Sequence, residues 1–374
     1  MTTRRGNGEG TIRQRTDGRW EAQLSLPGGK RKSVYGKTRK EARDALKVAL
    51  KKLDDGVDLG APGQTLEAFL ESWLAESKSR VRPKTHRTYQ DLLRLHVIPD
   101  IGKIQLDRLA APQIATLLRD KQAAGLAPKT VGHIRATLRA ALNQAVRWRL
   151  IAHNPAAAVA APRVPHAEVQ VLTAEEARTL LAAAKGHRHE ALWVVALSLG
   201  LRQGEVLGLR WTDVDFEANT LRITRALTRV DGKLVLAEPK TEQSRRTLPL
   251  SLRVREALLA HRDRQVFTKA MAGEHWQEQD FVFASTVGTP LQPRNTLEAW
   301  YKLLAQAGLP RRKFHVARHT AVSLLIADGV PLRVVMELLG HSQISTTANT
   351  YGHVFAESLR EAADAMDRTL GTGS

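Results

Sequence analysis

Residues 200–205, GLRQGE, place an arginine where chemistry is possible. The apolar stretch WVVALSLG predicts a buried helix that ends here, and EVLGLRW predicts that a second helix begins. Such a junction presents Arg202 to a ligand, and a guanidinium matches the oxygens of a phosphate without losing its charge. Glu205 can support Arg202 or the neighbouring backbone. A purely structural salt bridge between the two would explain the segment about as well.

Residues 315–319, HVARH, form a second candidate. On a helix, His315 and Arg318 are i, i+3 neighbours and can reach the same phosphate. His319 follows His315 by four residues, which is also the histidine spacing of the H-E-x-x-H zinc motif. That motif needs a glutamate after its first histidine, where this chain has Val316. We therefore predict a phosphate-binding pair and no metal site.

The third candidate comprises His341 and Tyr351. Pro331 suits the first turn of a helix, PLRVVMELL, and Gly340 suits the left-handed position after its last residue. We expect a second short helix to begin near Ser345 and to carry Tyr351 at its far end. The chain has four tyrosines, and Tyr351 taken alone would be interpreted as a core residue.

The same region permits a different interpretation. AVSLLIADGVPLRVVMELLGHSQISTTANTY has the helix, glycine turn and helix spacing of a transcription-factor helix-turn-helix. A DNA-binding regulator without catalysis would need one recognition helix. It gives no reason for the arginines, histidine and tyrosine described above to occur together.

The composition indicates what these residues act on. A formal net charge of +19 and a pI near 10.5 favour a polyanionic partner, because lysine and arginine release counterions from phosphate backbones. We expect nucleic acid and no membrane, since the longest apolar stretch, residues 191–201, is about half of the ~20 residues that a spanning helix needs. MTTRRGNGEG has no apolar segment behind its arginines, so we expect no secretory signal and a cytoplasmic location. The absence of cysteine excludes disulfides, thiolate zinc sites, iron–sulfur clusters and a cysteine nucleophile.

About half of the net charge lies in residues 1–52, which hold fifteen lysines and arginines against five acidic residues. TIRQR, WEAQLSL and KRKSVYG predict three short strands separated by glycine-containing turns, and KTRKEARDALKVALKKL predicts a helix. We therefore predict a small folded DNA-binding domain, residues 1–55, rather than a solvated basic tail. Its candidate DNA contacts are Arg13, Arg15, Arg19, Lys30, Arg31 and Lys32.

Helical periodicity dominates residues 64–153. In LEAFLESWLAES the apolar positions follow the i, i+3, i+4, i+7 pattern of one buried face, and we expect four or five helices in this domain. The last of them, within KTVGHIRATLRAALNQAVRWRLI, carries Arg135 and Arg139 largely away from its apolar side. This basic face either contacts DNA phosphates or is an ordinary solvated face.

Residues 154–170 contain three prolines among small residues and predict a linker. A further domain, residues 171–374, opens with the capping-box pair Thr173 and Glu176 and is mainly helical. Its one β-rich interruption, residues 221–250, has an Asp-Gly hairpin turn and a closing strand, TLPL. The predicted fold class is mainly α with small β-sheets (α+β).

Taken in order, three segments resemble the catalytic domain of the tyrosine recombinases, the phage integrase family. They are GLRQGEVLGLRWTDVDF, EPKTEQSRRTLPL and HVARHTAVSLLIADGVPLRVVMELLGHSQISTTANTYGHV. The resemblance covers residues 172–370 and implies a mixed helical catalytic domain with a β-hairpin insert. The two upstream domains are similar in layout to the arm-site-binding domain and the helical, SAM-like core-site-binding domain of phage-type members.

The resemblance implies a role for each matching residue. Arg202 and Arg318 would clamp the scissile phosphate, and Tyr351 would attack it. Lys240, in the PKT turn of the β-rich insert, would be the general acid that protonates the departing 5′ oxygen.

The two histidines would complete the pocket. His315 and His341 would hydrogen-bond phosphate oxygens and assist proton transfer, with Glu205 as support behind them. Many members have H-D-L-R-H where this chain has HVARH. Val316 and Ala317 are the differing positions, so we expect altered local support rather than lost catalysis.

This set of residues fits phosphodiester exchange. Attack by a side-chain oxygen builds negative charge on the non-bridging oxygens and leaves a poor alkoxide leaving group, for which two arginines and a lysine acid are suited. A 3′-phosphotyrosine stores the bond energy until a 5′-hydroxyl attacks it, so neither ATP nor a metal is required. The sequence has no P-loop and no clear acidic metal cluster. Because a phenol has a pKa near 10, Tyr351 needs cationic neighbours to ionise.

The implied function is site-specific recombination of double-stranded DNA through a Holliday junction, integrating or excising a mobile element without a cofactor. A type IB topoisomerase-like relaxing enzyme shares the chemistry and is the alternative within this class. The implied partners are attachment sites of core and arm type, sister copies that form a tetramer on DNA, and DNA-bending and excision-directing accessory proteins. A nucleoid-associated location is implied as well.

The segment after Tyr351, VFAESLREAADAMDRTL, is amphipathic. In the family such a segment often docks on a neighbouring subunit, whereas a self-packed terminal helix is the alternative. We expect a monomeric or weakly associated protein without DNA and a tetramer on paired sites.

Overall fold

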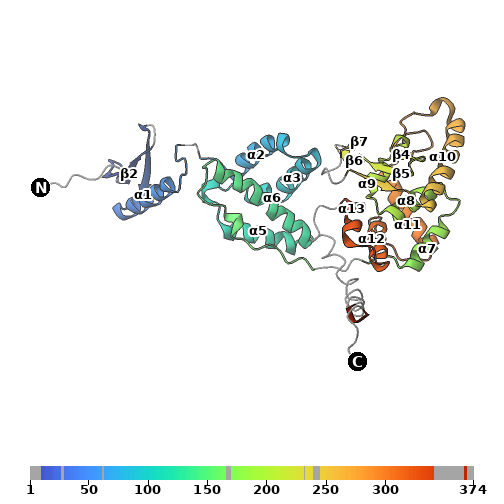
Figure 1. Cartoon of the computed structure of the whole chain (residues 1–374). Coiled ribbons are helices and arrows are strands. Elements are labelled where there is room, and N and C mark those ends of the chain that lie inside the picture. The colour runs from blue at the N-terminus through green and yellow to red at the C-terminus, as the bar shows by residue number, and fades with distance from the viewer. Residues whose placement is uncertain are drawn as a thin grey trace. The chain divides into compact units, whose positions relative to one another are not determined.

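The computed structural model describes residues 10–26, 29–60, 63–165, 170–230, 232–238, 245–340 and 366–368 (Figure 1). The chain divides into two compact units, Met1–His166 and Ala167–Ser374. Within the described residues, no helix is long and apolar enough to cross a membrane.

The predicted sheet and helix at the N-terminus are confirmed. Strands β1 (Thr11–Gln14), β2 (Trp20–Ser25) and β3 (Arg31–Gly36) pair antiparallel in that order, followed by α1 (Arg39–Asp54). The Thr38 hydroxyl caps α1 by accepting from the Glu41 N–H. Leu24 of the sheet and Leu46 of the helix are buried in one small core, so the segment is a folded module and not a solvated tail.

The second part of this unit is a helical bundle, as predicted. Its helices are α2 (Leu66–Arg80), α3 (Pro83–His96), α4 (Ile98–Ile101), α5 (Ala111–Ala123) and α6 (Pro128–Arg147). The apolar face read from LEAFLESWLAES is buried throughout, with Phe69 and Leu70 fully inaccessible. Ile134 and Leu138 of α6 meet it in the same core.

The second unit is mainly helical with two small antiparallel sheets, which confirms the predicted fold class. Its helices are α7 (Ala174–Ala183), α8 (Glu190–Leu199), α9 (Gln203–Leu207), α10 (Leu252–Ala272), α11 (Pro293–Gln306), α12 (Val316–Ala327) and α13 (Leu332–Leu339). Its strands are β4 (Val214–Asp215), β5 (Thr220–Ile223), β6 (Ala226–Val230), β7 (Lys233–Ala237) and β8 (Arg246–Pro249). The described strands form a sheet of order β4-β5-β8 and the predicted hairpin β6-β7.

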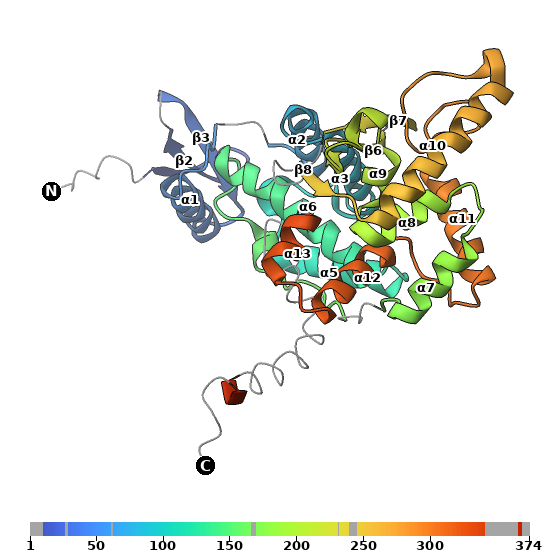
Figure 2. The same cartoon turned by 45° about the vertical axis from the view of Figure 1, so that its right-hand side comes forward.

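Helix α8 is the centre of this unit. It lies between α7 and α10 in both views (Figures 1 and 2), and it also packs against α12. Eight of its ten residues are buried, which explains why its sequence is apolar all round rather than amphipathic. The indole of Trp193 lies 5.6 Å from that of Trp300 and 5.9 Å from the Phe314 ring, joining α8 to α11 and the segment before α12. The reciprocal bonds of Thr173 and Glu176 confirm the capping box of α7.

Two glycines end helices next to the candidate residues. Gly200 follows α8 with φ at 59°, and Gly340 follows α13 with φ at 64°, so both adopt the left-handed conformation. A Cβ on Gly200 would lie 3.1 Å from Leu339 Cδ2 and 3.2 Å from Ala321 Cβ. The end of α8 therefore packs directly on α12 and α13, where a side chain has neither the backbone freedom nor the space.

Gly200→Ala tests this close packing. We expect a larger loss of folding free energy than for Gly308→Ala, because Gly308 has φ at 69° but nothing within 4 Å of its Cβ position. Both changes force alanine into the left-handed region at about 1–2 kcal/mol, and overpacking adds about 1–3 kcal/mol at Gly200 alone. Urea unfolding of the full chain measures both losses, and equal losses would contradict the packing.

Candidate active site

Three segments that are far apart in the sequence meet around one side chain, Arg318. Its Nη1 donates to the Gly200 carbonyl and its Nη2 to the Leu339 carbonyl, each at 2.8 Å. Arg318 lies on α12 and is 3% exposed. The buried Arg318 guanidinium thus joins the ends of α8 and α13. It brings the candidate segments 200–205 and 315–319 together, next to the residues that precede His341 in the sequence.

Arg202 and Glu205 form the second part of the cluster. Arg202 Nη1 lies 2.6 Å from Glu205 Oε1, and the Arg202 N–H donates to Glu205 Oε2 at 3.0 Å. The Arg202 side chain is 39% exposed, whereas that of Glu205 is 5% exposed. Glu205 therefore holds the guanidinium from the protein side and leaves its other side accessible. The sequence offered two alternatives for Arg202, a structural salt bridge and an arginine accessible to a ligand. The structure combines them, because Arg202 is paired with Glu205 and is also partly exposed.

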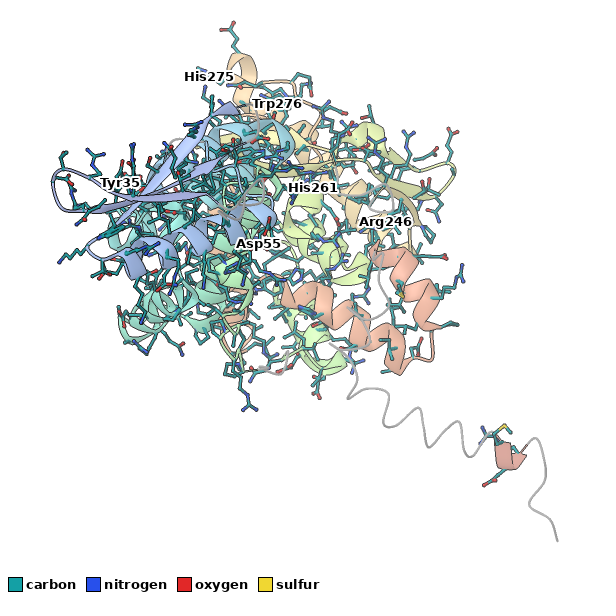
Figure 3. The ribbon with its side chains drawn as sticks, turned by 90° about the vertical axis from the view of Figure 1, so that its left-hand side faces the viewer. Tyr35, Asp55, Arg246, His261, His275 and Trp276 are labelled. Carbon is teal, nitrogen blue, oxygen red and sulfur yellow. The ribbon has the colours of Figure 1, made fainter. Side chains whose placement is uncertain are left out.

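Glu205 keeps its negative charge although it is buried. Burial alone would raise the pKa of its carboxyl group, but Arg246 and Arg202 outweigh the burial and lower that pKa below its ordinary value. Arg246 Nη2 lies 3.0 Å from Glu205 Oε2, and Arg246 Nε donates to the Leu338 carbonyl at 2.6 Å. Arg246, labelled in Figure 3, thus belongs to the cluster.

Sequence reasoning missed Arg246 because the predicted closing strand, TLPL, begins one residue after it. A signal for it was present. Arg246 and Leu248 are two residues apart in β8, so they share a face of the strand, and Leu248 is buried. A charged residue on the buried face of a strand needs a partner, which predicts an ion pair.

His315 stands directly before α12, three residues from Arg318. Its ring meets the His319 ring edge to face with centroids 4.7 Å apart. Burial, followed by the charges of His319, Arg318 and Arg202, lowers the pKa of His315 to about 4, and Glu205 opposes this only partly. The imidazole is therefore neutral at neutral pH, and it can donate a hydrogen bond through one ring nitrogen and accept one through the other.

Three predicted residues lie outside the part of the chain that the structure describes. They are Lys240, His341 and Tyr351. The predicted helix near Ser345 and most of the amphipathic C-terminal segment also lie outside it. Their roles stay predictions.

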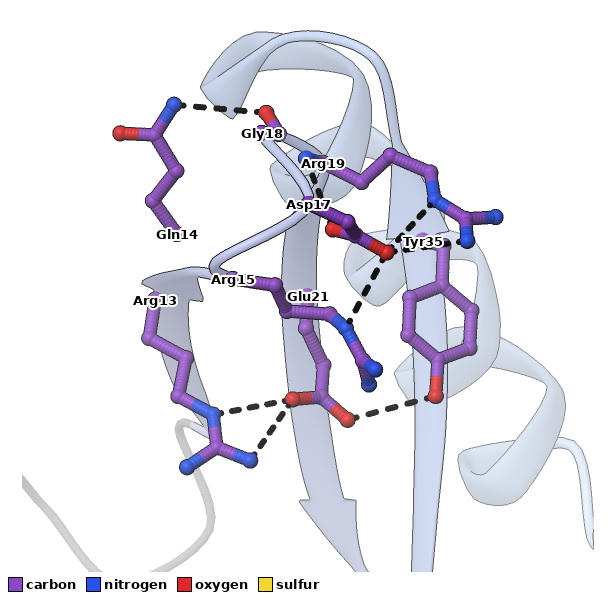
Figure 4. A network of polar contacts seen from close by, with 8 residues as sticks. All are labelled: Arg13, Gln14, Arg15, Asp17, Gly18, Arg19, Glu21 and Tyr35. Atoms are coloured by element: carbon purple, nitrogen blue, oxygen red, sulfur yellow. Dashed lines mark hydrogen bonds and ion pairs between the residues drawn. The ribbon is translucent and has the colours of Figure 1, made fainter.

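In the N-terminal module, a buried carboxylate holds one of the predicted DNA-binding arginines (Figure 4). Arg13 pairs with Glu21 at 2.8 Å, and the Tyr35 hydroxyl donates to the same carboxylate at 3.3 Å. The Glu21 side chain is 5% exposed, whereas that of Arg13 is 72% exposed. Arg15 lies over the Tyr35 ring at 5.7 Å. Bonds from Ser33 and Arg13 lower the pKa of Glu21, so it stays ionised.

Asp17 plays the same part in the turn between β1 and β2. Its carboxylate lies 2.9 Å from Arg19 Nη2 and 3.6 Å from Arg15 Nε (Figure 4). Sequence reasoning counted Asp17 and Glu21 among the acidic residues of this segment but did not pair them with the arginines that they hold. An i, i+2 pair across a turn was the available signal for Asp17.

The remaining predicted DNA contacts differ in how free they are. Lys30 and Arg31 are exposed. Lys32 Nζ donates to the Leu59 carbonyl at 2.7 Å, after the end of α1. The two segments are thereby linked, and part of the hydrogen-bonding capacity of Lys32 is used within the protein.

Helix α6 shows a similar division. Arg139 is exposed, whereas Arg135 is half-buried and its Nε donates to the Val159 carbonyl at 2.6 Å. Arg135 therefore ties down the segment after α6, and Arg139 is the freer of the two to meet a phosphate. DNA contact by either residue stays a prediction.

A partly exposed arginine backed by a carboxylate, a buried second arginine and a neutral histidine thus lie together in the second unit. Comparisons give the family. The model described as "Phage integrase family" matches residues 170–358, and "Phage integrase, N-terminal SAM-like domain" matches residues 65–121. The chain belongs to the phage integrase family and is a tyrosine-type site-specific recombinase.

Several relatives match most of the chain, among them the following two. A "Tyrosine recombinase XerC-like" protein of Caldanaerobacter subterraneus is 34% identical over 90% of this chain and 91% of its own length. An "Integrase" of Saccharopolyspora erythraea is 30% identical over 98% of this chain and 97% of its own. Family membership favours the recombinase over the helix-turn-helix regulator and the topoisomerase-like enzyme.

Two solved structures share the fold. The Tn1549 transposon integrase in complex with transposon right end DNA has a TM-score of 0.71 at 22% identity, covering 82% of this chain and 99% of that one. A lambda integrase tetramer bound to a Holliday junction has a TM-score of 0.58 at 20% identity, covering 93% and 96%.

The depressed pKa of His315 sets a pH dependence. Between pH 6.5 and 4 the unfolded chain binds a proton at His315 that the folded chain does not, so the contribution of His315 to folding stability falls as the pH falls through this window. We expect the C2 proton signal of His315 in NMR spectra to keep its neutral position at pH 5.5.

His315→Gln identifies the signal by its loss. This control is needed because burial also lowers the pKa of His189, to about 4, and the pKa values of His261 and His319. A His315 signal that titrates near pH 6.5 would contradict the burial of a neutral imidazole.

Proposed function

We propose that this recombinase is the integrase of a mobile element and that Tyr351 is its nucleophile. The observation that carries the proposal is the convergence of Arg202, Glu205, His315 and Arg318 in one cluster at the ends of α8 and α13. Gly340 caps the C-terminus of α13, and His341 is the next residue in the sequence. The relatives named as integrases, which include one from mycobacteriophage L5, support a mobile element.

In the proposed reaction, the Tyr351 hydroxyl oxygen attacks the scissile phosphorus and the bond to the 5′ oxygen breaks. His315, neutral at physiological pH, assists removal of the phenolic proton. Lys240 gives a proton to the departing 5′ oxygen. Arg202 and Arg318 neutralise the charge on the non-bridging oxygens. A 5′-hydroxyl from the partner strand then attacks the phosphotyrosine and releases Tyr351.

The two arginines are suited to different parts of this task. Arg202 is partly exposed and can approach a phosphate directly. Arg318 uses two donors on the Gly200 and Leu339 carbonyls, so it combines phosphate binding with the assembly of the site. A guanidinium has five N–H donors and can serve both purposes at once.

We further propose four functional parts. They are an arm-site-binding domain (1–55), a core-site-binding domain (64–153), a linker (154–170) and a catalytic domain (171–374). The clustered positive charge of the first part supports contact with arm-type sites. The solved lambda integrase tetramer on a Holliday junction supports a tetramer on paired sites. DNA-bending and excision-directing proteins would act at the same sites, in the cytoplasm on the nucleoid.

A nicked suicide duplex tests the nucleophile. It carries the core attachment site, taken from the junction of the circular element, with a nick close to the scissile phosphate. After cleavage the short 5′-hydroxyl fragment dissociates, so the covalent adduct accumulates. We expect the adduct with the wild type and none with Tyr351→Phe. An adduct retained by the phenylalanine variant would refute the assignment.

Alanine substitutions test the phosphate clamp. We expect Arg202→Ala to keep its affinity for the duplex within about threefold and to form the adduct about 10²- to 10³-fold more slowly, the usual cost of one lost oxyanion donor. Arg318→Ala should cleave as poorly and also unfold at lower urea, because it leaves the Gly200 and Leu339 carbonyls without their donor. Complete loss of DNA binding by Arg202→Ala would indicate a structural role instead.

A further inference from the structure

Arg246 occupies a point that connects three parts of the catalytic unit. It is the first residue of β8, and its side chain is 6% exposed. Nη2 contacts Glu205 Oε2 at 3.0 Å, and Nε donates to the Leu338 carbonyl at 2.6 Å. One buried guanidinium therefore joins the sheet, the carboxylate behind Arg202 and the last turn of α13.

The carbonyls at the end of α13 explain the second contact. The last four carbonyls of a helix have no partner within it, and the negative end of the helix dipole attracts cations. Arg246 satisfies the Leu338 carbonyl and Arg318 satisfies the adjacent Leu339 carbonyl. Two arginines from different elements thus hold the last turn of α13 in place.

The shared carboxylate explains the first contact. Glu205 Oε2 accepts from both Arg246 and the Arg202 N–H, while Oε1 faces Arg202 Nη1. Without Arg246, this buried carboxylate would keep Arg202 as its single cationic partner among the described residues. Glu205 would then either take up a proton or draw the Arg202 guanidinium further inward, and in both cases Arg202 would move relative to a bound phosphate.

We propose that Arg246 is a positioning residue for strand cleavage. It fixes the orientation of the Arg202 side chain through Glu205, and it holds the last turn of α13 through the Leu338 carbonyl. It does not touch the phosphate. This inference rests on the proposed function, since it assumes that Arg202 binds the scissile phosphate.

The test compares two substrates. Both are the nicked suicide duplex described above, one with an ordinary scissile phosphodiester and one with a methylphosphonate at that position. The methyl group removes the charge that Arg202 neutralises, so a defect that acts through Arg202 shrinks on the neutral substrate. A general loss of structure slows both reactions equally.

We expect Arg246→Met to bind the duplex within about threefold of the wild type and to form the adduct about 100-fold more slowly on the phosphodiester. On the methylphosphonate the deficit should be below about tenfold. Arg246→Lys should recover part of the rate, because an ammonium can pair with Glu205 but lacks the fork that also reaches the Leu338 carbonyl.

Two further variants separate positioning from folding. Arg225→Met is the matched control, because Arg225 Nη2 lies 3.6 Å from Asp213, a carboxylate that is 4% exposed in the same unit. It should cleave at the wild-type rate. The double variant Arg246→Met with Glu205→Gln removes the orphaned charge, so it should unfold at higher urea than Arg246→Met and still cleave slowly.

Equal slowing of Arg246→Met on both substrates, or a wild-type rate on the phosphodiester, would overturn the proposal. Recovery of cleavage by the double variant together with its stability would also overturn it, since the defect would then be one of folding. The wild type serves as the check on the proposed function: if it forms no adduct on the phosphodiester, the nucleophile assignment fails before Arg246 is in question.

Discussion

A buried carboxylate keeps its charge only where cations and hydrogen-bond donors replace the water it has lost, and the candidate site depends on one such group, Glu205. Arg202 and Arg246 hold it from two sides, and their charges keep its pKa low despite burial. In return, Glu205 limits where the accessible arginine can point. In the proposed reaction this carboxylate orients Arg202 for the phosphate before DNA binds, so much of the ordering cost falls in folding rather than in DNA binding.

The second constraint is the meeting of helix ends. Gly200 lets α8 end against α12 and α13, and guanidinium groups donate to the helix-end carbonyls there. Arg318 and Arg246 therefore pair with backbone carbonyls and hold them in place, as Glu205 pairs with Arg202 and holds its side chain. The same physical requirement, that buried polar groups be paired, holds the cluster together and orients its cationic side chains.

The basic N-terminal module follows this rule at a surface. Glu21 and Asp17 reduce its net positive charge, yet each holds an arginine whose guanidinium stays largely exposed. Fixed arginines lose less conformational entropy on binding a phosphate backbone than free ones do. A strongly basic sequence can thus contain acidic residues that favour DNA binding.

Periodicity and turn chemistry are local, so the sequence by itself determined the elements: the three-stranded sheet with its helix, the apolar face of α2, the central helix α8 and the β6-β7 hairpin. It also determined which residue types are available for phosphate chemistry. Apart from the local pair of Arg202 and Glu205, the pairing of these residues was decided only by the tertiary structure. Arg246 meets Glu205 across 41 residues and Arg318 meets Gly200 across 118. No local pattern encodes such contacts, because the partner of a buried charge depends on how distant helices and strands pack.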